Sequence, residues 1–227
     1  MNLLKKHLII GFIFLGIFSL KSQGNLQYQD DRPYHFGFFV GLNTMDFGVE
    51  LNNPELAAAE VSSLMPGFTA GIIGNLRLNR YFGLRFSPAI NFTERTLTYR
   101  FYGETTTMQE SVFSIPLMLP LHIKYSAERI HNFRPYLLAG GGVYFDFGRD
   151  MERNILLQPF DYYVEFGTGC DIYFPFFKLS PELKFAIGFN NVLTPNNIRE
   201  SGTFDPKFGN ALSGLTTKMI TLSFNFE

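Results

Sequence analysis

Side chains alternate between apolar and small or polar residues along several long stretches of this chain. The clearest case is 176–190 (FFKLSPELKFAIGFN), where every odd position except Pro181 carries Phe, Leu or Ile. Successive side chains of a β-strand point to opposite faces, so a period of two predicts strands with one apolar face. The chain is therefore expected to consist mainly of β-strands.

The same alternation recurs along the rest of the chain and predicts eight strands. These runs are about 12–17 residues long, whereas strands of globular proteins are most often about 5–6 residues. A tilted strand crosses the hydrocarbon of a membrane in about 9–11 residues, so such lengths suit a membrane barrel. The predicted fold class is all-β, an eight-stranded antiparallel transmembrane β-barrel with a filled lumen. The strands are expected at about 34–48, 66–79, 81–95, 110–126, 132–148, 160–175, 176–192 and 215–227.

Composition decides which face of the predicted strands points outward. Charged residues make up 17% of the chain, against about 25% in soluble domains, while 27 Phe and 11 Tyr give an aromatic share of 17%. The faces opposite the apolar ones hold Gly, Ser, Ala, Asn and occasional charges, whereas a water-facing surface normally carries more Lys and Glu. A soluble barrel would turn its apolar face inward. We therefore expect the Phe-rich face to contact lipid and the small, polar face to fill the lumen.

The segment 1–23 is predicted to be a secretory signal peptide. A basic pair at 5–6 precedes an apolar run over 8–20, which is shorter than the about 20 residues needed to span a bilayer. Cleavage is expected near 22–24, which leaves 24–227 as one outer-membrane β-barrel domain. An N-terminal membrane anchor is the alternative interpretation.

The predicted connections alternate between long and short. Outer-membrane barrels have short periplasmic turns and longer outer loops, so both termini are expected at the periplasmic end. The long connections are at 49–65, 96–109, 149–159 and 193–214, and the short ones are near 79–80, 126–131 and 174–177.

The connection at 49–65 differs in kind from the others. Asn53-Pro54 is followed by an Ala-rich stretch that also carries Val61 and Leu64, which predicts a short helix with apolar content. On an outer loop, such a helix would either cap the barrel mouth or dock a partner.

Several residues fit a regular barrel poorly. Proline has no N–H to donate, and a closed barrel has no free edge where that loss is harmless. Bulges or rim positions are therefore expected at Pro88, Pro116, Pro120 and Pro181. The terminal Glu227 departs from the aromatic residue that usually ends such barrels.

The charges on the lumen-facing side form the candidate functional site. An unpaired buried charge is costly, so these side chains must pair with one another in a narrow lumen. A structural salt-bridge network is the favoured interpretation, and a small polar conduit is the alternative, although porins need about 16 strands to leave a channel. The candidate residues are Arg77, Arg85, Lys124, Glu165, Asp171, Glu182 and Lys184.

No catalytic, metal or cofactor site is predicted. An enzyme at the outer rim would need a nucleophile, a base and an orienting group, but His35 and His122 are expected near the periplasmic end and His131 in a periplasmic turn. The sequence has no G-x-S-x-G motif, and 140–142 (GGG) falls within a predicted strand, where glycine permits close backbone approach. The single cysteine, Cys170, cannot form an internal disulfide or a zinc cluster by itself.

Charge and composition also limit the partners. With 19 Lys plus Arg against 20 Asp plus Glu, the chain has no positive excess to track nucleic-acid phosphates. The aromatic content excludes a disordered chain. The expected partners are outer-membrane lipid and other proteins, with neither nucleic acid nor a small-molecule substrate.

Three stretches carry a resemblance to a known family: 32–47 (RPYHFGFFVGLNTMDF), 114–126 (SIPLMLPLHIKYS) and 134–147 (RPYLLAGGGVYFDF). They resemble the PorT-type outer-membrane β-barrel proteins of the Bacteroidota. The resemblance implies a location in the cell outer membrane and a role in type IX protein secretion, which also delivers adhesins in gliding species. It implies other secretion-system proteins as partners and supplies no catalytic residues. The alternatives are a small structural or adhesin-like barrel unrelated to secretion, a narrow channel, and an outer-membrane enzyme.

Overall fold

A computed structural model describes residues 32–52, 57–101, 107–148, 154–194 and 211–227. The predicted signal peptide at 1–23 lies outside these residues. Within the described part of the chain, no helix is long and apolar enough to cross a membrane. The strands are β1 (Tyr34–Leu51), β2 (Ala57–Leu64), β3 (Pro66–Arg77), β4 (Phe82–Phe86), β5 (Ala89–Phe101), β6 (Met108–Ser114), β7 (Pro116–Ser126), β8 (Phe133–Asp146), β9 (Phe160–Tyr173), β10 (Lys178–Gly188) and β11 (Leu212–Phe226).

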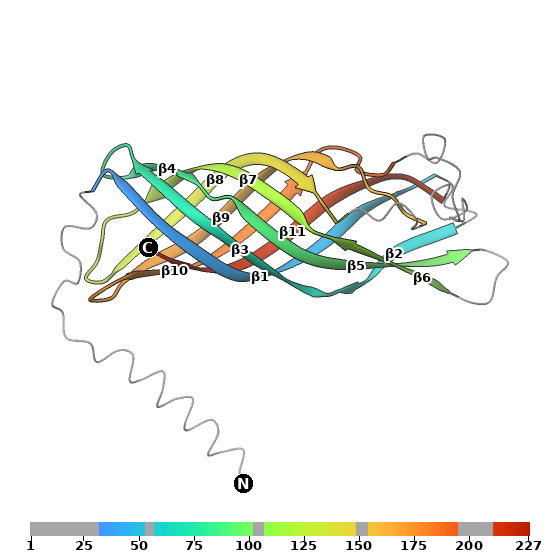
Figure 1. Cartoon of the computed structure of the whole chain (residues 1–227), viewed down its shortest axis with the longest axis horizontal. Coiled ribbons are helices and arrows are strands. Elements are labelled where there is room, and N and C mark those ends of the chain that lie inside the picture. Colours follow the sequence, from blue (N-terminus) through green and yellow to red (C-terminus); the bar gives the residue numbers. More distant parts are fainter. Residues whose placement is uncertain (1–31, 53–56, 102–106, 149–153, 195–210) are drawn as a thin grey trace, which may run out of the picture.

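The strands close into a ring. Three consecutive pairs, β2–β3, β4–β5 and β6–β7, continue one another across short breaks, so each pair acts as one strand of the wall. The ring closes because β1 pairs with β11 on one edge and with β3 on the other, and Phe38 lies opposite both Phe226 and Ile72. The predicted eight-stranded antiparallel barrel is confirmed, and Figure 1 shows it along its length.

The first residues of β1 and the last residues of β11 lie at the same end of the barrel. β1 begins and β11 ends there, on the left in Figure 1. The turns that join β3 to β4, β7 to β8 and β9 to β10, at 78–81, 127–132 and 174–177, lie at this end too. Short turns face the periplasm in outer-membrane barrels, so we call this end the periplasmic end and the opposite one the outer end.

The predicted helix within 49–65 is wrong. β1 continues to Leu51, and β2 pairs antiparallel with the second half of β5, with Ala57 opposite Phe101 and Leu64 opposite Arg95. The backbone N–H and C=O groups of an extended strand need partners, and this pairing outweighs the helix preference of an Ala-rich stretch. The connection predicted at 96–109 also becomes mostly strand, so the wall extends farther at the outer end than expected.

The four prolines expected at bulges or rim positions lie at or opposite irregularities inside the wall. Pro88 lies in the break between β4 and β5, and Pro116 begins β7 after the break that ends β6. Pro120 lies opposite the first of these breaks, where its carbonyl accepts from Ser87 N at 3.4 Å. The β9–β10 ladder is interrupted around Pro181. Each missing N–H therefore falls where the ladder is already incomplete.

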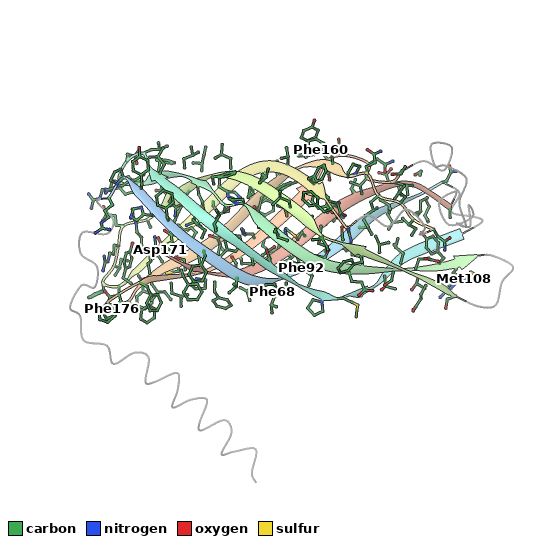
Figure 2. All side chains as sticks on the ribbon, in the orientation of Figure 1. Phe68, Phe92, Met108, Phe160, Asp171 and Phe176 are labelled. Carbon is green, nitrogen blue, oxygen red and sulfur yellow. The ribbon has the colours of Figure 1, made fainter. Side chains whose placement is uncertain are left out.

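Apolar side chains point outward around the barrel, as predicted. Along β11, Leu222 and Phe224 are 43% and 42% exposed. The residues that alternate with them, Ser223 and Asn225, are buried. Figure 2 shows side chains projecting from the outside of the wall, among them the labelled Phe68 and Phe92. A continuous belt of this kind would be a liability in water but is the ordinary lipid-facing surface of a membrane barrel.

Candidate functional site

The candidate site is a set of charged side chains inside the periplasmic half of the barrel. They occupy alternate, inward-facing positions on strands from around the ring, which is why residues far apart in the sequence meet. We call these buried residues the lumen charge network: Arg85, His122, Lys124, Glu165, Asp171, Lys178, Glu182, Lys184 and Glu227.

Arg85 on β4 lies at the centre of this network. Its Nη1 donates to Glu182 Oε2 on β10 at 2.6 Å, and its Nη2 donates to Glu227 Oε1 at 3.1 Å. The Nε group donates to Asn75 Oδ1 at 2.8 Å. The guanidinium carbon also lies 5.4 Å from the centre of the Tyr136 ring. One arginine therefore connects three parts of the wall across the lumen.

Glu182 accepts two further hydrogen bonds at the same carboxylate oxygen that accepts from Arg85. Tyr136 OH donates to its Oε2 at 2.6 Å, and Asn225 Nδ2 donates to the same oxygen at 3.2 Å. Lys184 Nζ lies 3.7 Å from Glu182 Oε1. A buried carboxylate needs such compensation, because removing it from water without partners is costly.

A second group of ion pairs surrounds Asp171 on β9. Lys124 Nζ donates to both carboxylate oxygens at 2.8 and 3.1 Å, and Ser180 Oγ donates to Oδ1 at 2.6 Å. Lys178 Nζ donates to Glu227 Oε2 at 2.7 Å and lies 3.9 Å from Asp171. Glu227 thus joins this group to Arg85.

The third group extends toward the middle of the barrel. His122 Nε2 lies 2.7 Å from Glu165 Oε2, and both side chains are buried. Lys184 Nζ lies 3.8 Å from Glu165 Oε1 and so joins this pair to Glu182. The two residues resemble a base with its orienting carboxylate, but they are enclosed in the lumen.

The structure brings six of the seven predicted residues together and places the seventh apart. Arg77 lies on the inward-facing side of β3 but at the periplasmic rim, where it is half-buried and its Nε donates to the Asn79 carbonyl at 3.3 Å. It lines the same cavity as Lys124 and Asp171 without being part of the buried ion pairs given above.

Sequence reasoning missed three members of the network. Lys178 shares the parity of Glu182 and Lys184 along β10, so the alternation could have included it. Glu227 ends the last predicted strand, 215–227, and its departure from an aromatic end is the available signal. His122 was placed near the periplasmic end but was not paired with Glu165. A single sequence shows which face a residue lies on, but not its partner across the barrel.

The lumen around the network is nearly filled. Two cavities farther along the barrel have volumes of about 10 Å³ each, which is room for about one water molecule. Four basic side chains, Arg85, Lys124, Lys178 and Lys184, are balanced by four carboxylates, Glu165, Asp171, Glu182 and Glu227.

The interior changes from charged to apolar toward the outer end. Two connecting segments fold over this end: Gln158 N donates to Val192 O at 2.7 Å, and Thr194 N donates to Leu156 O at 2.9 Å. Arg95 is buried here, with its guanidinium 4.0 Å from the centre of the Phe47 ring. We call the apolar residues that fill this end the outer core: Phe47, Leu97, Tyr99, Val112, Ile155, Leu157, Val192, Leu193, Leu212 and Leu215.

Two other features bear on possible chemistry. Among the described residues, no group of three or more His, Cys, Asp or Glu side chains is arranged to hold a metal ion. The glycines at 140–142 lie in the middle of β8, and a Cβ on Gly140 would collide with the Leu121 carbonyl oxygen. Their structural role is therefore close approach of β8 to both neighbours, since Gly140 and Gly142 face the backbone of β7 and Gly141 faces that of β9.

Comparison with known proteins gives three results. Residues 22–194 match a family model described as "Outer membrane protein beta-barrel domain". Among solved structures, the chain is similar to the outer membrane protein OprG from Pseudomonas aeruginosa (14% identity, 84% of this chain and 92% of that chain, TM-score 0.49) and to Neisserial surface protein A (14% identity, 83% and 95%, TM-score 0.37). No curated protein matches the chain.

Proposed function

The chain belongs to the outer membrane protein β-barrel domain family, and on this premise we propose that it is a non-enzymatic accessory component of the type IX protein secretion machinery. It acts by binding other proteins of that machinery from its place in the outer membrane. The support for the secretion role is the resemblance of 32–47, 114–126 and 134–147 to PorT-type barrels.

One observation carries the non-enzymatic, protein-binding part of this proposal. The lumen is filled by paired charges in its periplasmic half and by the outer core at its other end. In the part of the chain that the structure describes, the lumen beyond its periplasmic mouth contains cavities of only about 10 Å³ each, which are too small for a substrate or for a continuous solute path. What remains available for function is the outside of the barrel and its two ends.

The His122–Glu165 pair is assigned a structural role for the same reason. Both side chains are at most 2% exposed, and general acid–base catalysis requires the base to reach a substrate proton. Replacing both with uncharged glutamine, as His122→Gln and Glu165→Gln, is expected to leave secretion intact if the barrel assembles.

The proposal is tested by deleting the gene and measuring cargo secretion. Secreted cargo in the culture medium is expected to fall, and unprocessed cargo to accumulate in the periplasm, while an unrelated outer-membrane marker and detergent resistance stay unchanged. Expression of the full chain from a plasmid should restore secretion. Normal secretion in the deletion strain would contradict the proposal.

A structural or adhesin-like barrel is the second candidate, and one observation favours it. β5 and β6 extend at the outer end, and their outward positions there include polar Thr98, Arg100 and Gln109. A surface of this kind could contact another cell or matrix. Loss of adhesion with normal cargo secretion in the same deletion strain would select this candidate instead.

A further inference from the structure

The outside of the barrel wall carries an apolar groove of about 550 Å³. It crosses β7, β8, β9 and β10, which are consecutive neighbours in the ring (Figure 1). Its volume falls within the range of about 300–1,000 Å³ that is typical of ligand pockets. We call this space the wall groove, and its lining includes Ile123, Tyr125, Leu137, Ala139, Phe166 and Thr168.

A small side chain between two large ones creates the wall groove. Ala139 on β8 lies opposite Ile123 on β7 and opposite Phe166 on β9. Ile123 and Phe166 both point away from the lumen and are 56% and 49% exposed. Side chains directly opposite each other on paired strands are neighbours on one face of the sheet. The methyl group of Ala139 therefore leaves a gap in an otherwise bulky row.

The width of this gap limits what it can hold. Neighbouring strands lie about 4.8 Å apart, so the backbones of β7 and β9 are about 10 Å apart across β8. The Ile123 and Phe166 side chains occupy part of that distance. An α-helix with its side chains is about 10–12 Å in diameter, which is too wide to enter. A single hydrocarbon chain is narrower and flexible enough to lie in the gap.

The wall groove offers almost no hydrogen-bonding groups. Among its lining residues, all of them in the described part of the chain, only Tyr125 and Thr168 have polar side chains. Thr168 Oγ1 donates to the Tyr136 carbonyl oxygen at 3.2 Å, so this hydroxyl is already bonded within the wall. The surface presented to an occupant is therefore hydrocarbon, with the Tyr125 hydroxyl at one end.

That end of the wall groove lies at the periplasmic edge of the lipid-facing surface. Tyr125 is the last but one residue of β7, and its ring centre is 5.1 Å from that of Phe82 and 6.4 Å from that of Tyr81. Aromatic residues gather at the level of the lipid headgroups in membrane barrels. The wall groove thus starts at headgroup level and continues among the side chains that contact lipid. An acyl chain of the periplasmic leaflet follows the same course.

We propose that the wall groove holds one acyl chain of a phospholipid from the periplasmic leaflet of the outer membrane. The chain fills the gap at Ala139, and its headgroup stays at the level of Tyr125. Bulk lipid is as apolar as the groove, so the preference for this position comes from added dispersion contacts. The proposal goes beyond the secretion role and does not depend on it.

The test uses phosphatidylcholine that carries a photoactivatable diazirine on one acyl chain. The full-length purified barrel is placed in nanodiscs with a small fraction of this lipid, and labelled residues are mapped by mass spectrometry after illumination. Labelling at Ile123 and Phe166 is expected to be about fivefold higher than at lipid-facing residues around Ala70, because many weak dispersion contacts add up. Equal labelling of the two regions would overturn the proposal.

Filling the gap supplies the decisive variant. Ala139→Phe should lower labelling at Ile123 and Phe166 to the level found around Ala70, whereas Ala139→Gly keeps the gap open and should retain it. The matched control is Ala70→Phe on β3, where Ala70 lies opposite Val40 and Ile90 and outside the wall groove. Heat-modifiable gel mobility verifies that each variant is folded. Unchanged labelling in Ala139→Phe, or an equal loss in the control, would contradict a specific site.

An apolar segment of a partner protein is the alternative occupant, and a second arm distinguishes it. The crosslinking substitution Ile123→p-benzoylphenylalanine, at the edge of the wall groove, is introduced in cells of the source organism and activated by light. The expected adduct has the mass of a phospholipid. A discrete protein adduct that disappears in combination with Ala139→Phe would overturn the lipid assignment. Normal or defective cargo secretion has no bearing on either arm, so failure here is distinct from failure of the secretion test.

Discussion

Arg85 Nη1 lies 2.6 Å from Glu182 Oε2 inside the barrel, and the two side chains are 1% and 3% exposed. Arg85 is on β4, which pairs with β3 and β7, whereas Glu182 is on β10, which pairs with β9 and β11. The ion pair therefore connects strands that are not neighbours in the wall. It ties opposite sides of the ring together through the lumen.

Replacing Arg85 with alanine is expected to destabilise the barrel strongly. The change leaves the carboxylates of Glu182 and Glu227 buried without their guanidinium, which costs about 3–5 kcal/mol for a buried ion pair. Urea unfolding in detergent, followed by heat-modifiable gel mobility, measures the free energy of unfolding. The control is Arg80→Ala, which breaks the exposed pair with Glu128 and should cost about 0–1 kcal/mol. Equal costs for the two variants would contradict a structural role for the network.

Replacing Leu222 with arginine tests the direction of the apolar face. Leu222 is on the outer side of β11, opposite Leu42 on one neighbouring strand and Leu183 on the other. An arginine at such a lipid-facing position should cost about 2–4 kcal/mol near the membrane midplane. Gln109→Arg, on an exposed position of β6 at the outer end, should cost about 0–1 kcal/mol. A soluble, monomeric Leu222→Arg protein in plain buffer would show that the barrel faces are reversed.

Replacing Gly140 with alanine is expected to hinder the pairing of β7 with β8. The added Cβ would meet the Leu121 carbonyl oxygen, so the backbones would have to move apart at a cost of about 1–3 kcal/mol. Gly74→Ala is the control, because there the nearest atom to the added Cβ is on the Phe36 ring at 3.8 Å, an ordinary contact. The fraction of protein with folded gel mobility after refolding measures both. Equal yields would show that β8 does not approach β7 this closely.

The purified barrel is expected to give no steady conductance in a planar bilayer. The lumen charge network and the outer core fill the axis, and open aqueous channels are found in barrels of about 16 strands. A general porin reconstituted in the same bilayer provides the positive control. Stepwise ohmic currents that scale with the amount of this protein would support the narrow-channel alternative.

Alternation along the sequence was sufficient to predict the strands and their faces. Inward and outward positions of β11 follow directly from the run of Leu222, Ser223, Phe224 and Asn225, because the side-chain period of a strand is a local property. The same parity placed Arg85 and Glu182 in the lumen. Lys178 occupies an inward position of the same alternation.

Where local preference and strand pairing disagreed, the prediction was wrong. The Ala-rich stretch at 57–64 has the composition of a helix but forms β2, because β5 offers it a row of backbone partners. Of the two positions expected for the strand prolines, bulges or the rim, the structure has irregularities inside the wall. Neither outcome can be obtained from a segment considered alone.

Alternation and composition were enough to predict a barrel of β-strands with phenylalanines outward and charges inward. Which charges meet became clear from the folded barrel, where Arg85 joins Glu182 and Glu227 while Arg77 remains at the rim. The face on which a residue lies depends on its neighbours along one strand, whereas its partners across the lumen depend on the register of all strands at once. Closing the ring sets that register, and no local pattern encodes it.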